Sequence, residues 1–143
     1  MGFLLDYTTG IGMPRPKMQH QIVMSQLHGN MFNELKSKGL EVLSEACLSQ
    51  TNLNDLVPDL SIYNQQYTQL LAIIEITTNG SLMKNIRKCE ELMARFPDME
   101  YFVFDYEANV WYAFDAEADE WFNSEEYEIR SRYLEHPMPD YLI

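Results

Sequence analysis

The chain has 143 residues, of which 46% are hydrophobic and 22% are charged, and this size predicts a single domain over residues 1–143 and excludes two. No apolar run is long enough to cross a membrane, and the first residues lack the basic flank of a secretion signal. The two cysteines, Cys47 and Cys89, are too few for a disulfide framework or a zinc site, so we expect a cytoplasmic protein.

The formal net charge of −12 comes almost entirely from the C-terminal third. Residues 98–143 contain thirteen acids and two bases, whereas residues 1–97 contain nine acids and eight bases. We therefore expect a core over about residues 13–115, followed by an acidic extension over about residues 116–143. An acidic surface repels nucleic acid, because Lys and Arg supply most of the affinity for the phosphate backbone. Solubility and a dedicated partner both remain open as the purpose of this charge.

The first half of the chain predicts one helix and two strands. Met13–Pro16 predicts a stiff, extended lead-in. Residues 17–38 contain no proline and have apolar residues at helical spacing, so they predict a helix that Gly39 ends. Three segments follow: a strand at 40–47, a loop at 49–55 and a strand at 57–63 that contains Pro58 near its start.

The second half predicts a central strand, a second helix and a hairpin. Residues 70–76 are almost continuously apolar, which is typical of a strand that is covered on both faces. Ser81 is a suitable N-cap for a helix over 82–96, which Pro97 ends. The remaining segments are a hairpin formed by 101–104 and 110–114, one more short strand, and an irregular tail. The order α-β-β-β-α-β-β predicts an α/β (α+β) fold with a mixed central sheet flanked by helices.

Two acids need an explanation beyond surface charge. Glu75 lies inside the most apolar strand, and Asp59 follows a proline at the start of another strand. A buried carboxylate costs several kcal/mol unless it finds a partner, and a divalent cation would relieve two adjacent carboxylates at once. Oxygen ligands suit Mg²⁺ or Mn²⁺, and hydrolysis of a phosphodiester is a reaction that such a pair serves.

These residues carry a resemblance to a known group of proteins. Pro58-Asp59, the run Glu75-Ile76-Thr77 and the segment 100–105 after an amphipathic helix together resemble the PD-(D/E)XK nuclease superfamily, and within it the Uma2 family of endonucleases. The resemblance extends upstream to Met13–Pro16 and His20 and covers about residues 10–114. It implies a restriction-endonuclease-like core and an enzyme that hydrolyses DNA. It also implies Asp59 and Glu75 as metal ligands, helped by the backbone carbonyl of Ile76.

The chain departs from the pattern of the superfamily at the lysine. Thr77 stands where the superfamily has a lysine, and Uma2 members commonly supply one from the following helix instead. An ungapped comparison places that helical lysine at Cys89 and the acid before it at Asn85. Lys84 and Lys88 lie nearby, and we weigh a catalytic role for each against a solvated face, which the helical wheel favours.

Each candidate also has a plain structural interpretation. Glu75 could pair with a helix-borne arginine such as Arg87, and Asp59 could cap a turn. His20 could assist catalysis, although a lone histidine beside an apolar helix face is more often structural. His28, which precedes a glycine, is expected at the surface. The apolar hairpin around Trp111 and Tyr112 suggests a homodimer, as does the family resemblance.

Two functions therefore compete. The first is a metal-dependent endonuclease that acts on DNA. The second is a catalytically degraded member of the same fold that binds or regulates a partner through its acidic extension. A lysine amino group beside the two carboxylates would favour the enzyme, and lysines that face bulk solvent would favour the degraded protein.

Overall fold

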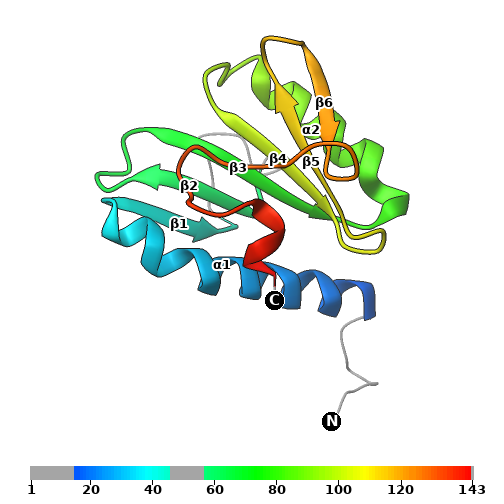
Figure 1. Ribbon diagram of the computed structural model, residues 1–143, viewed down its shortest axis with the longest axis horizontal. Coiled ribbons are helices and arrows are strands. Elements are labelled where there is room, and N and C mark those ends of the chain that lie inside the picture. Colours follow the sequence, from blue (N-terminus) through cyan, green and yellow to red (C-terminus); the bar gives the residue numbers. More distant parts are fainter. Residues whose placement is uncertain (1–14, 46–56, 143) are drawn as a thin grey trace.

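The computed structural model describes residues 15–45 and 57–142, with side chains described from Met18 onward in the first segment. Its elements follow the predicted order (Figure 1). The helices are α1 (Arg15–Ser37) and α2 (Leu82–Met93), with short 3₁₀ turns at Asn79–Ser81 and Met138–Tyr141. The strands are β1 (Leu40–Ser44), β2 (Leu60–Asn64), β3 (Leu70–Thr77), β4 (Glu100–Asp105), β5 (Val110–Asp115) and β6 (Glu120–Asn123). The predicted mixed α+β fold is confirmed.

The six strands form one sheet in which spatial order equals chain order. Neighbouring strands are antiparallel except β3 and β4, which are parallel. A parallel pair needs a crossover, and α2 provides it. The end of β3 therefore leads directly into the loop that begins α2, so residues on this strand and this helix can share one site.

The two faces of the sheet are covered differently. On one face, α2 packs on Ile73, Tyr101 and Val103 through its buried residues Ile86, Cys89 and Leu92. On the other face, α1 covers the β1–β3 half and the C-terminal segment lies across the sheet beside it, as Figure 1 shows. β3 lies between these layers, which explains why almost every side chain of this strand is buried.

The first helix starts earlier than its sequence suggests. Arg15 and Pro16 belong to α1, so the extended lead-in expected over Met13–Pro16 is wrong at these two positions, and its first two residues lie outside the described part. Proline is tolerated there because the first turn of a helix has no intrahelical acceptor for its amide. The predicted end at Gly39 is confirmed, and its φ of 75° is one that glycine adopts without strain.

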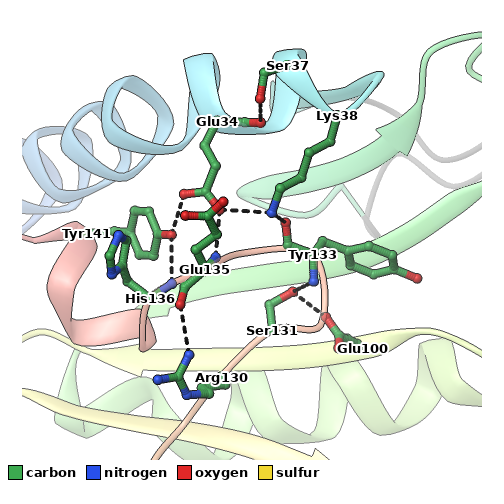
Figure 2. Close-up of polar contacts among 10 residues, drawn as sticks. All are labelled: Glu34, Ser37, Lys38, Glu100, Arg130, Ser131, Tyr133, Glu135, His136 and Tyr141. Atoms are coloured by element: carbon green, nitrogen blue, oxygen red, sulfur yellow. Dashed lines mark hydrogen bonds and ion pairs between the residues drawn. The ribbon is translucent and has the colours of Figure 1, made fainter.

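The C-terminal segment belongs to the main core. Ile129, Leu134, Met138 and Tyr141 are all buried against the same cluster as α1. Figure 2 shows how the segment is fastened: Tyr141 Oη donates to Glu34 Oε1 at 2.6 Å, and the backbone N–H of Glu135 donates to Glu34 Oε2 at 2.6 Å. The acids of this region therefore lie on a segment whose apolar side chains complete the fold.

Two local expectations differ from the structure. β2 begins at Leu60, after Pro58, because proline cannot donate to a neighbouring strand. Ser81 occupies the N-cap position of α2 without making a side-chain cap, and Thr78 instead accepts the Ser81 N–H at 3.3 Å. The loop expected at 49–55 and Cys47 lie outside the described residues.

The predicted interface hairpin contributes to the core instead. Trp111 is 1% exposed and stacks on Phe104, with ring centroids 4.6 Å apart. Tyr112 packs beside the cluster on the α2 face. Trp111 is therefore not available to a second copy of the chain, and dimerisation stays a prediction. Within the described residues, no helix is long and apolar enough to span a membrane.

Candidate active site

Asp59 and Glu75 meet where β2 begins opposite the end of β3. The β2–β3 register pairs Leu60 with Ile74, and one further step along the two antiparallel chains sets Asp59 opposite Glu75. The Asp59 backbone N–H donates to Glu75 Oε2 at 3.3 Å, and the Ile76 backbone N–H donates to Asp59 Oδ2 at 2.7 Å. Each carboxylate is therefore held by the backbone of the other strand, and the two acids form one rigid unit.

Glu75 is buried, and Lys88 is its cationic partner. Burial raises the pKa of Glu75 to about 8, and the charge of Asp59 adds to the rise while Lys88 opposes it. Lys88 Nζ lies 3.1 Å from Glu75 Oε1 and donates to the Val57 carbonyl at 2.8 Å. The expectation of a solvated Lys88 is wrong, as is Arg87 as the partner of Glu75, because Arg87 is exposed. The long lysine stem lets the ammonium group of an α2 residue reach Glu75 on β3.

His20 reaches the same unit from α1. Its Nε2 lies 3.1 Å from Asp59 Oδ2, and this hydrogen bond, with the negative charge of Asp59, raises the pKa of His20 against the opposing effect of burial. The structural interpretation of His20 as a residue beside an apolar helix face misses this contact. No sequence pattern signals it, because the contact depends on where the start of α1 crosses the edge of the sheet.

Thr77 and Asn85 form a neutral pair beside the acids. Thr77, which stands at the lysine position of the superfamily, is buried and accepts a hydrogen bond from Asn85 Nδ2 at 2.8 Å. Asn85 Nδ2 also donates to the Ser81 carbonyl at 3.2 Å. Both amide hydrogens are thus used, which leaves Asn85 Oδ1 as the acceptor at this point of the site. The sequence singles out Thr77 as the position that lacks a lysine and Asn85 as the position that lacks an acid, and it gives no hint that the two residues contact each other.

A cavity of about 390 Å³ lies over these residues. It is lined by Asp59, Glu75 and Ile76 together with His20, Gln21, Glu45, Thr77, Thr78, Ser81, Asn85, Lys88 and Tyr106. Lys84 is exposed and is not part of the lining, and Cys89 is buried in the core beneath α2. Of the two helical lysines, only Lys88 enters the cavity.

The donors fit a hard divalent cation with few protein ligands. Within residues 18–45 and 57–142, no three His, Cys, Asp or Glu side chains gather as a metal site. Asp59 Oδ1 has no hydrogen-bond partner among the described residues, whereas Oδ2 is held by Ile76 and His20. Mg²⁺ commonly binds through one or two carboxylates and keeps several waters, and Asp59 Oδ1 could serve as one such ligand, whereas both oxygens of Glu75 already accept a hydrogen bond.

Comparison with known proteins supports the fold. No family model matches the chain, and no curated protein matches it. Its structure is similar to the crystal structure of a DUF820 protein from Anabaena variabilis ATCC 29413 that is provisionally described as a nuclease. The TM-score is 0.57 at 15% sequence identity, and the match covers 92% of this chain and 84% of the other. DUF820 is of the Uma2 type, so the resemblance to Uma2-like nucleases is confirmed at the level of the fold.

Proposed function

We propose that this protein is a divalent-metal-dependent endonuclease that hydrolyses phosphodiester bonds in DNA. The observation that carries the proposal is the arrangement of Asp59 and Glu75 in one cavity, with Lys88 Nζ 3.1 Å from Glu75. The nuclease-like fold supports the same reaction class. The metal, the DNA substrate and the cytoplasmic location belong to the proposal.

Asp59 and Glu75 would hold Mg²⁺ or Mn²⁺, with the Ile76 carbonyl as a further ligand. When bound, the ion would orient a water and neutralise charge on the phosphate that is attacked. Asp59 Oδ1 has no hydrogen-bond partner among the described residues, while Asp59 Oδ2 and both oxygens of Glu75 are held by backbone N–H groups, His20 and Lys88. Both acids are thus already oriented before an ion or a substrate binds.

Lys88 and His20 would supply the protons and the positive charge. Lys88 holds Glu75 in place and presents an ammonium group to the anionic substrate, which is the task that the superfamily gives to its lysine. His20 holds Asp59 Oδ2 and lines the cavity, where it can pass a proton to a departing oxygen. Lys84 has no part in this scheme because it lies outside the cavity.

The position of Lys88 favours an enzyme over a degraded nuclease fold. The degraded alternative rests on lysines that face solvent and on an acidic extension that is free to bind a partner. Instead, Lys88 is partly buried against Glu75, and the C-terminal segment packs its apolar residues into the core. The contact between Lys88 and Glu75 is what supports the enzyme over this alternative.

Plasmid nicking tests the proposal. The purified chain should nick supercoiled DNA with Mg²⁺ or Mn²⁺, and chelation should stop the reaction. Asp59→Ala and Glu75→Ala should each abolish nicking, whereas Lys84→Ala should leave the rate unchanged. Nicking that survives both carboxylate substitutions would place the activity elsewhere, and a folded wild-type chain that never nicks DNA would overturn the proposal.

A further inference from the structure

A second pocket adjoins the cavity along α1. It has a volume of about 240 Å³ and is lined by Gln21, Met24, Ser25, His28 and Ser44. Gln21 lines both spaces, so the pocket continues the cavity over the outer edge of the sheet. Its volume is below the ~300–1,000 Å³ of a typical small-molecule site, which suits one part of a larger ligand that also occupies the cavity.

Among the described residues, the lining of this pocket is mostly polar and contains no Lys, Arg, Asp or Glu. Its four α1 residues occupy positions i, i+3, i+4 and i+7, so they lie on one face of the helix. Buried Met24 supplies an apolar floor, and the His28 ring, which stacks on Phe32 with centroids 5.8 Å apart, supplies an aromatic wall. A phosphate would find neither Lys nor Arg among these five residues. A flat, uncharged ring could pack its face on Met24 and His28 and form hydrogen bonds through its polar edge.

The edge of β1 adds a hydrogen-bonding pair. β1 is an edge strand, and odd-numbered residues bond toward β2, as the Glu45 N–H does to the Asp59 carbonyl at 2.9 Å. Even-numbered residues therefore direct their backbone groups outward. The Val42 carbonyl is met by His28 Nε2 at 3.2 Å, so His28, expected at the surface, is fixed against the strand. The next outward pair, the N–H and C=O of Ser44, has no partner among the described residues and lies at the pocket.

We propose that this pocket binds the unpaired nucleobase next to the phosphodiester that is cut. The inference rests on the proposed nuclease function, because the cavity must hold the phosphate while the pocket holds the adjoining base. The face of the base would pack on Met24 and His28, and its Watson–Crick edge would meet the outward Ser44 backbone. In a duplex that edge is already paired, so the substrate is single-stranded or unpaired at the cut.

Two leucine variants on adjacent positions of α1 test the inference. Ser25→Leu fills the pocket, whereas Gln26→Leu places the same side chain on an exposed position outside it. Leucine favours helix, so both variants should fold. Both are made in a Glu75→Gln chain, which keeps the strand intact. The probes are a short single-stranded oligodeoxynucleotide and the same strand with one base removed at successive positions, and the readout is fluorescence anisotropy.

The Gln26→Leu chain should bind the intact strand roughly fivefold or more tightly than a strand that lacks one particular base, which corresponds to the ~1 kcal/mol lower limit for stacking one base. The Ser25→Leu chain should bind both strands equally. The inference is overturned if the two variants discriminate alike, or if no base removal weakens binding. Nicking by the wild-type chain is measured separately. Nicking without base discrimination would overturn only the proposal that the pocket binds a base. Base discrimination without nicking would overturn only the proposed nuclease activity.

Discussion

Lys88 Nζ lies 3.1 Å from Glu75 Oε1, although the two residues belong to different layers of the fold. Glu75 is on the central strand β3 and Lys88 is on α2, the helix that crosses from β3 to β4. Because the crossover is short, a lysine on the helix can occupy the space that a lysine two residues after Glu75 would fill. Thr77, at that strand position, instead holds Asn85.

Replacement of Lys88 should therefore affect both activity and stability. Lys88→Met should abolish nicking and lower the free energy of unfolding by about 1–3 kcal/mol, because it leaves a buried carboxylate without its donor. Lys84→Met, on the exposed side of the same helix, should change stability by no more than about 0.5 kcal/mol and leave nicking intact. Urea unfolding measures the effect on stability, and plasmid nicking measures the effect on activity. Equal stability and equal nicking in the two variants would show that Lys88 has no role in the site.

The buried Glu75 should make stability depend on pH. Its pKa is raised from the ordinary 4.5 to about 8, so the folded chain binds a proton that the unfolded chain has already lost. The contribution of Glu75 to stability should therefore fall as pH rises from about 4.5 to about 8 and stay constant above, with a slope of up to about 1.4 kcal/mol per pH unit.

Glu75→Gln isolates this effect because glutamine does not titrate. In the presence of a chelator, the stability of the variant relative to the wild type should increase across this pH range. Urea unfolding at several pH values measures the difference. Two stability profiles that run parallel would show that Glu75 ionises in the folded chain as it does in the unfolded one.

His20 should compete with the metal for Asp59 at low pH. Its pKa is raised, so its pairing with Asp59 stabilises the fold below the ordinary pKa of about 6.5 and loses this effect as pH rises through the raised value. Mn²⁺ affinity should accordingly increase between pH 6 and pH 8. In His20→Asn the increase should be smaller, with Glu75 accounting for the remainder. Calorimetric titration at both pH values measures the Mn²⁺ affinity. The same increase in His20→Asn as in the wild type would show that His20 does not compete with the metal.

The contact between Tyr141 and Glu34 should contribute measurably to stability. Burial, with the hydrogen bond to Glu34, raises the pKa of Tyr141 to about 12, and the same bond helps to lower the pKa of Glu34 (Figure 2). Tyr141→Phe keeps the ring and removes the hydroxyl, so it should cost about 1–3 kcal/mol. Tyr127→Phe is the matched control, because that tyrosine is exposed and stacks on Phe122 through its ring. Equal unfolding midpoints would show that the contact does not hold the segment.

The order of elements could be predicted because each has a local signal. The apolar run of β3, the helical spacing before Gly39 and the hairpin pattern all depend on neighbours in the chain. The C-terminal segment has no such period: its buried residues Ile129, Leu134 and Met138 are unevenly spaced among acids. Composition therefore suggested an acidic extension where the structure has part of the core.

The two acids of the site could be predicted, and their surroundings could not. A carboxylate in an apolar strand is conspicuous in any sequence, so Glu75 draws attention without a structure. The contact of His20 with Asp59 depends on the placement of α1 against the sheet edge. A helical wheel likewise ignores the length of the Lys88 stem, which carries the ammonium back to Glu75.

Calorimetric titration of Mn²⁺ into the wild-type chain, Asp59→Asn and Glu75→Gln tests most directly whether the two carboxylates share one ion. The account predicts one site in the wild type and its loss in each variant, with all three chains equally folded by circular dichroism. Undiminished Mn²⁺ binding in either folded variant, or none in the wild type, would contradict it.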